Sequence, residues 1–275
     1  MRKELFRMVC SVWFVLGICF TFALCFFSEL VTGEHSYTII QVLRNMSPAE
    51  IAGEPQLLPD VALRNAFSGY VTLFLPIVSA LPMIQLLHVE RGSGYKRFYM
   101  SRRSCREYYW NKWIAGMLSG ALMLLIATIF FHIFLALSLP EMDAETLKMA
   151  GYTVRNRVFN IGRTYIGILV YGAFSVIPAI LISSFTNNFY FVLCLPFMFS
   201  YFWDVAMSSL AKWMRAQQMS EIYSNVIELL FSRAYLGIAW YREDFLVESG
   251  RILVLMTALF VIYFAYLSRR RDCGE

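Results

Sequence analysis

The stretch IAGMLSGALMLLIATIFFHIFLALSL, residues 114–139, decides the fold class of this chain. It contains no Asp, Glu, Lys or Arg, and His132 is its one histidine. A helix needs about 20 consecutive apolar residues to cross roughly 30 Å of hydrocarbon. Because the bilayer core holds no water, the backbone there must satisfy its own hydrogen bonds, as a helix does. Residues 114–139 are therefore predicted to span a membrane as a helix.

Five further runs of the sequence are also long and mostly apolar. Hydrophobic residues make up 59% of the 275 and charged residues 16%, whereas a soluble domain ordinarily carries about 25% charge. We therefore predict an all-α integral membrane protein, a single transmembrane domain over residues 1–275 with six transmembrane helices. The other five predicted spans are residues 9–27, 66–87, 165–186, 189–207 and 252–268.

One more segment, residues 222–241, has the length of a span but contains Asn225, Glu228 and Arg233. A charge at the centre of a spanning helix costs roughly 2.5–3.5 kcal/mol. The segment is therefore predicted to be an interfacial or re-entrant helix before the sixth span. The predicted external loops are residues 28–65, 140–164 and 208–251. The first is acidic and broken by prolines, so we expect an irregular loop with at most one short helix.

Charge placement predicts the orientation. The two termini, residues 88–112 and residues 187–188 together hold 13 basic and 5 acidic side chains, a balance of +8. The remaining segments hold 11 basic and 14 acidic side chains. Because positive charge stays on the cytoplasmic side, both termini and residues 88–112 are predicted to be cytoplasmic, in a plasma or inner membrane. This pattern explains the basic pI, so no nucleic-acid partner is expected.

Residues that could carry chemistry are few. No phosphate-binding loop of the G-x-x-x-x-G-K-[ST] type occurs, and the three histidines fall on different sides of or within the predicted membrane. We therefore expect neither an enzyme nor a metal site. Asp204 is the single acid in a predicted span, and an acid there is a candidate for a transport pathway. Glu221 and Glu228, on the polar face of the predicted interfacial helix, are further pathway candidates.

The predicted cytoplasmic segment 88–112 reads HVERGSGYKRFYMSRRSCREYYWNK. Gly92 and Gly94 permit a sharp exit from the second span. Aromatic residues then predict a short helix with one aromatic face, followed by a new helix capped by Ser101 or Ser104, with Glu107 as the capping-box partner of Ser104. A basic, aromatic segment of this kind is also typical of a plain membrane-surface anchor.

These residues resemble the permease subunits of ABC-2-type transporters. In that family the second span ends in a Glu, followed by Ser-Gly-x-Tyr-like residues, a short coupling helix, Ser-Arg, and Arg-Glu-Tyr…Lys at the third span. Arg103 departs from the Pro that relatives often carry. The matching positions are Glu90, Ser93-Gly94, Tyr95-Lys96, Ser101-Arg102, Arg106-Glu107-Tyr108 and Lys112.

The resemblance implies a permease subunit that forms a translocation pathway with a second permease copy or a homologous permease, with export the expected direction. ATP and Mg²⁺ would be bound by separate ABC ATP-binding subunits, so this chain itself would need no cofactor. The residues implied in coupling to those subunits are Glu90, Gly94, Tyr95, Lys96, Arg97, Phe98, Tyr99 and Arg102. Tyr95 and Phe98 are the expected docking face. Glu90 is expected to form an exposed pair with Arg91, Arg97 or a partner cation, worth under about 1 kcal/mol.

Two other classes of protein stay open. A non-transporting membrane scaffold or regulatory subunit would use segment 88–112 to bind something other than an ATPase. An ion-coupled carrier should place several charges near the bilayer midplane, and the nearly uncharged spans make this the weakest alternative. Aromatic and Met-rich spans fit a hydrophobic or amphipathic cargo and fit lipid contact equally well.

Overall fold

The structure is a computed structural model of the whole chain. It describes residues 2–32, 35–54, 57–67, 70–101, 104–140, 154–186, 188–217, 258–259 and 261–263. These ranges are mostly helical. The predicted interfacial helix at 222–241 lies outside the described residues, as do most of the predicted sixth span and residues 141–153 of the second external loop.

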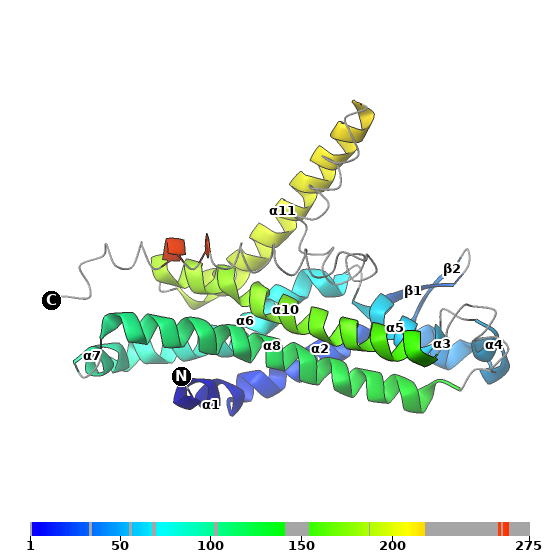
Figure 1. Ribbon diagram of the computed structural model, residues 1–275, viewed down its shortest axis with the longest axis horizontal. Helices are drawn as coiled ribbons and strands as arrows, with labels where there is room; N and C mark the ends of the chain where they lie inside the picture. Colours follow the sequence, from blue (N-terminus) through cyan, green and yellow to red (C-terminus); the bar gives the residue numbers. More distant parts are fainter. Residues whose placement is uncertain are drawn as a thin grey trace.

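Three long helices run side by side and form the centre of the molecule: α6 (Tyr70–Gly92), α8 (Cys105–Ser138) and α10 (Val154–Phe185) (Figure 1). Each contains a stretch long and apolar enough to cross a membrane. The described residues thus include three candidate membrane spans, which coincide with the predicted spans at 66–87, 114–139 and 165–186. The apolar stretches are Leu73–Glu90, Glu107–Ser138 and Val158–Ser183.

The predicted first span is a bent pair of helices. Helix α1 (Arg2–Val9) and helix α2 (Val12–Phe26) meet at an angle of 56°, and taken together they make a fourth candidate span. Ser11 explains the break. Its hydroxyl donates to the Met8 carbonyl oxygen at 2.7 Å and accepts from the Phe14 amide at 3.2 Å, so it ends one helix and caps the next. Helix α2 then packs against α6 and α8.

Helix α11 (Phe189–Ala216) points away from the other long helices (Figure 1). It covers the predicted fifth span at 189–207 and continues into residues that were predicted to be loop. Only Phe189–Met198 forms an apolar helical stretch, which is shorter than a span. The number of six spans therefore stays a prediction.

The predicted irregular loop at 28–65 is instead a small folded unit, here called the cap. It consists of a two-stranded antiparallel hairpin, in which Glu29 pairs with Thr38, followed by three short helices. The expectation of at most one short helix was wrong because two capping boxes, Thr38 with Gln41 and Ser47 with Glu50, start helices locally. The cap elements are β1 (Glu29–Thr32), β2 (His35–Thr38), α3 (Ile39–Asn45), α4 (Pro48–Gly53) and α5 (Pro59–Ala66).

The cap and the short helix α7 (Tyr95–Met100) lie at opposite ends of the bundle (Figure 1). Between these ends, α8 and α10 cross at two glycines. A Cβ atom added to Gly120 would lie 2.8 Å from the Gly172 carbonyl oxygen, and one added to Gly172 would lie 2.8 Å from the Gly120 carbonyl oxygen. No side chain fits there, so the two backbones touch directly. Small residues allow this close approach of membrane helices.

The crossing gives a first prediction. Gly172→Ala should lower stability by about 1–3 kcal/mol, because the added methyl group overpacks a contact with backbone atoms that cannot move aside. Gly162→Ala is the matched control on the same helix, since nothing lies within 4 Å of its added Cβ. The control should be neutral or slightly stabilising, because alanine favours a helix over glycine. The unfolding midpoint of each purified variant in detergent measures the effect, and equal midpoints for the two would contradict the prediction.

Candidate functional site

The predicted coupling segment forms a tight connection between α6 and α8. Helix α6 ends at Gly92, α7 covers Tyr95–Met100, and α8 begins at Cys105. Gly94 has a φ of +68°, a left-handed conformation that glycine adopts without steric cost. The Ser104 hydroxyl accepts a hydrogen bond from the Glu107 amide at 3.3 Å and so caps α8. The predicted glycine turn, short helix and serine cap are all present.

Four charged side chains meet beside this connection, and we call them the four-charge cluster. Helix α1 contributes Glu4 and Arg7, α6 contributes Glu90, and α8 contributes Lys112. The Lys112 ammonium contacts the Glu4 carboxylate and lies 2.6 Å from Oε1 of Glu90. The Arg7 guanidinium lies 2.8 Å from the same Glu90 oxygen and 3.8 Å from Oε2 of Glu4.

The cluster is buried but electrically balanced. The side chains of Lys112 and Glu90 are each 1% exposed, and that of Arg7 is 39% exposed. Two carboxylates face two cations, so no charge is left uncompensated in a region of low dielectric. Removing one partner from a buried pair typically costs 3–5 kcal/mol, because the remaining charge is stranded. The cluster therefore fixes the positions of three helices relative to one another.

The expectation for Glu90 was wrong. It was predicted to make an exposed pair with Arg91, Arg97 or a partner cation. It is instead buried and paired with Arg7 and Lys112. The error arose because residues 88–112 were treated as one surface segment. Helix α6 continues two residues past Glu90, and the acid faces the bundle.

Two tyrosines attach α7 and α8 to the cluster. The Tyr108 hydroxyl donates to Oε2 of Glu90 at 3.0 Å. The Tyr95 hydroxyl donates to Oε1 of Glu4 at 3.5 Å, and the Arg7 guanidinium lies 4.9 Å from the centre of the Tyr95 ring. Partial burial, followed by the negative charge of Glu4, raises the pKa of Tyr95. The Tyr95 hydroxyl therefore faces α1, and the place of Tyr95 in a docking face stays a prediction.

Aromatic rings extend this contact beyond α7. Tyr99 stacks edge-on against Tyr108 at 5.2 Å, and Tyr108 against Tyr109 at 5.2 Å. Tyr109 lies 6.0 Å from Tyr263, a buried residue within the predicted sixth span. Ring contacts of this geometry add to the stability gained from burial. A continuous row of rings thus links α7 with the C-terminal part of the chain.

Phe98 is the aromatic residue of α7 that does point outward, with 56% of its surface exposed. Lys96 and Arg97 lie on α7, and only their backbone is described. Asp204 lies on α11, and its side chain is likewise undescribed. The remaining predicted site residues, Arg102, Glu221 and Glu228, lie outside the described residues.

A second polar network, unpredicted from the sequence, lies at the cap end. His132 of α8 lies 2.6 Å through Nδ1 from the Tyr165 hydroxyl of α10 and 3.2 Å through Nε2 from Oδ1 of Asp60 of α5. The sequence signal was a lone histidine inside a long uncharged run. Over the part of the chain that the structure describes, no group of three or more His, Cys, Asp or Glu side chains is placed to hold a metal ion.

Disruption of the four-charge cluster gives a second prediction. Lys112→Met should destabilise the protein by about 3–5 kcal/mol, because Glu4 and Glu90 would then share a buried site with one cation. The double variant Lys112→Met/Glu90→Gln should lose less stability than the summed losses of the two single variants, since the stranded carboxylate is removed. Lys212→Met, at an exposed position of α11, is the control. The midpoint of denaturant unfolding is measured for each variant and for the wild-type protein. Equal midpoints for Lys112→Met and Lys212→Met would disprove the structural role of Lys112.

Comparison of the chain with protein-family models, with curated proteins and with solved structures finds no match. The resemblance to ABC-2-type permeases therefore rests on the residues between Glu90 and Lys112 and on the arrangement of the apolar runs.

Proposed function

We propose that this chain is the permease subunit of an ATP-driven ABC transporter of the ABC-2 type, an exporter in a plasma or inner membrane. The observation that carries the proposal is the junction at α7. A short helix with an exposed aromatic residue contacts α1 through Tyr95 and α8 through Tyr99, and buried ion pairs join α1, α6 and α8. A partner that displaces α7 would therefore displace three helices together.

The exposed face of α7 supports the docking of a separate ATP-binding subunit. Buried aromatic anchors at the centre of an interface contribute most of its binding energy, often 2 kcal/mol or more on truncation. Phe98 is the outward aromatic residue of the helix, and the basic residues Lys96 and Arg97 precede it in sequence. In this proposal ATP and Mg²⁺ are bound by the partner, and the chain contributes no catalytic group.

Six spans with both termini in the cytoplasm would place α7 on the cytoplasmic side and the cap outside. The translocation pathway would form between this chain and a second permease copy or a homologous permease. Asp204, Glu221 and Glu228 are the proposed pathway residues, and the cargo is hydrophobic or amphipathic in this proposal.

Topology mapping provides a third prediction. Reporters fused after Lys112 and after Glu275 should read as cytoplasmic, and reporters inserted near Glu54, Glu145 and Gln218 should read as external. The physical reason is the +8 charge balance of the segments assigned to the inside. Paired alkaline phosphatase and green fluorescent protein fusions give opposite readouts at each site. A cytoplasmic reading at Gln218 would overturn the six-span topology.

Docking on α7 provides a fourth prediction. Phe98→Ala should weaken the association with the ATP-binding subunit about 30-fold, which corresponds to about 2 kcal/mol. Phe130→Ala is the matched control, because Phe130 is 54% exposed but lies on α8 away from α7. The readout is the amount of photo-crosslinked azido-ATP that co-purifies with each tagged variant in mild detergent, together with ATPase turnover.

The outcome distinguishes the proposal from its alternative. Loss of bound ATPase with Phe98→Ala and its retention with Phe130→Ala would support the coupling role. If both variants retain the ATPase fully, or if the wild-type chain carries none, α7 is not a coupling helix. The non-transporting scaffold then becomes the better explanation of the exposed aromatic residue.

A further inference from the structure

The short helix α1 lies beside the ends of two candidate spans. Its Arg7 is 2.8 Å from Glu90, the last residue of the apolar stretch Leu73–Glu90 of α6. Its Glu4 contacts Lys112, which lies near the start of the apolar stretch of α8. Helix α1 therefore lies at the level where these two candidate spans would enter a bilayer, toward the α7 end of the bundle (Figure 1).

Tryptophans lie at the same level on the neighbouring helices. Trp110 precedes Lys112 by two residues on α8, and 47% of its surface is exposed. Trp13 is the second residue of α2, and its ring lies 6.3 Å from that of Phe189. Tryptophan is enriched at the boundary between hydrocarbon and headgroups, where its apolar ring and its polar N–H are both accommodated. The tryptophans therefore place α1 at headgroup level, and its angle of 56° to α2 turns it away from the direction of that helix.

The charges of α1 are divided between two faces. Glu4 is the one acid of the helix, is 4% exposed and belongs to the buried four-charge cluster. Arg2 and Lys3 are exposed, and neither pairs with an acid within the part of the chain that the structure describes. The outer face of α1 is therefore positive, because the acid that could balance it is used inside the bundle.

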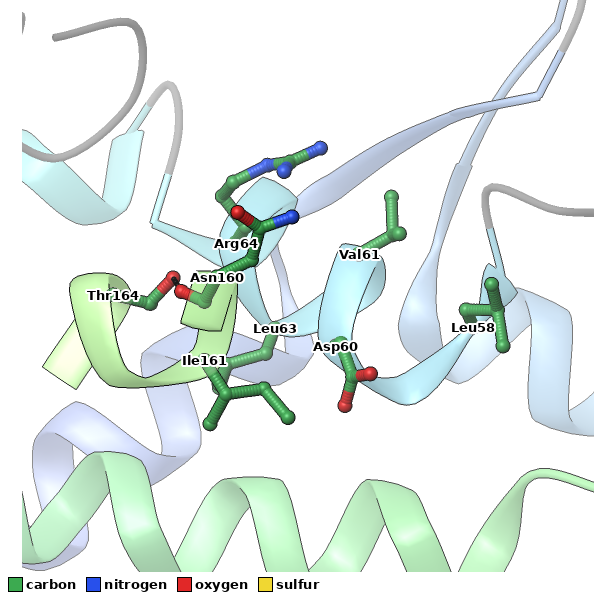
Figure 2. A pocket seen from close by; sticks show the side chains of 8 residues that line it. All are labelled: Leu58, Asp60, Val61, Leu63, Arg64, Asn160, Ile161 and Thr164. Carbon is green, nitrogen blue, oxygen red and sulfur yellow. Dashed lines mark hydrogen bonds between the residues drawn. The ribbon is translucent and has the colours of Figure 1, made fainter. Parts of the chain in front are cut away.

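The cap end of the bundle differs in this respect. Arg64 of α5 lines a solvent-open recess of about 390 Å³ between α5 and α10. Asp60, one turn earlier on the same helix, lines that recess too (Figure 2). The cation there has an acid in its immediate neighbourhood, whereas Arg2 and Lys3 do not.

Phe6 adds an apolar anchor to the positive face. It follows Lys3 by three positions and Arg2 by four, so the three side chains lie on the same side of the helix. The Phe6 side chain is 67% exposed, and Val12, 72% exposed, continues the apolar surface at the start of α2. Cations beside an outward aromatic ring are typical of a helix that lies at a membrane surface.

We propose that the outer face of α1, formed by Arg2, Lys3 and Phe6, binds the headgroups of anionic phospholipids. The two cations contact lipid phosphates, and the Phe6 ring enters the boundary between headgroups and acyl chains. Lipid is favoured over a protein partner because this face lies at headgroup level beside two candidate spans. The inference goes beyond the proposed transport function and does not depend on ATPase docking, which concerns Phe98.

Photo-crosslinking of the full chain in lipid nanodiscs tests this contact. Replacing Phe6 by p-benzoylphenylalanine keeps an aromatic ring at the position and, on illumination, joins it covalently to whatever lies against it. The nanodiscs contain equal amounts of phosphatidylcholine and phosphatidylglycerol, and mass spectrometry of the peptide that contains residue 6 measures both adducts. A cation near an anionic surface strengthens binding about fivefold, so phosphatidylglycerol adducts should exceed phosphatidylcholine adducts by at least about fivefold.

Two charge-matched double variants, both carrying the photoreactive residue, make the result specific. Arg2→Gln/Lys3→Gln should bring the two adducts close to equal amounts, because the cations that select the anionic lipid are gone. Arg44→Gln/Lys212→Gln removes the same charge from exposed positions of the cap and α11, and it should leave the excess unchanged. Equal amounts of the two adducts before the cations are removed, an absence of lipid adducts, or the same response of both double variants would overturn the proposal.

Discussion

Electrical neutrality of the buried cluster is the constraint on which the α7 end of the molecule depends. Glu4, Arg7, Glu90 and Lys112 come from three helices and share a space with little water. An isolated charge in such surroundings costs several kcal/mol, and opposite charges with short hydrogen bonds offset much of that cost. The helices α1, α6 and α8 are therefore held in the one arrangement that brings two acids onto two bases.

The kind of contact between the helices changes along the rest of the bundle. The cap end has one imidazole between a carboxylate and a hydroxyl. The middle has no charge at the crossing of α8 and α10, only two glycine backbones in contact. Polar contacts thus lie at the ends of the long helices and a close apolar crossing lies between them. This distribution is the one that a bilayer favours, because polar groups are least costly near its surfaces.

The sequence predicted those features that depend on neighbouring residues. Apolar runs located the long helices, Gly94 located the left-handed turn, and Ser104 located the start of α8. These are local rules, in which the residue type and its immediate context determine the backbone. The folded cap was missed although its capping boxes are local, because prolines are typical of irregular loops, whereas Pro48 and Pro59 are first residues of helices here.

The polar partners could not be predicted, because they join residues that are distant in sequence. Lys112 pairs with an acid 108 residues earlier, and nothing in either neighbourhood indicates the other. Glu90 was assigned an exposed position because its sequence neighbours are polar, whereas burial is set by the helices that pack around it. Recognising Glu4-x-x-Arg7 directly before an apolar run as a buried pair would have required knowledge of the fold.

The separation of Glu4 from Lys112 also has a consequence for biogenesis. During synthesis the acids and Arg7 of the cluster leave the ribosome before Lys112 does, and until α8 is made they carry an excess of negative charge. Such an incomplete set is stable only in contact with water. The charge balance therefore favours burial of α1 against α6 only once Lys112 of α8 is present. The last cation to be synthesised thus completes the neutral cluster, and the α7 junction is complete only when all three of its helices are present.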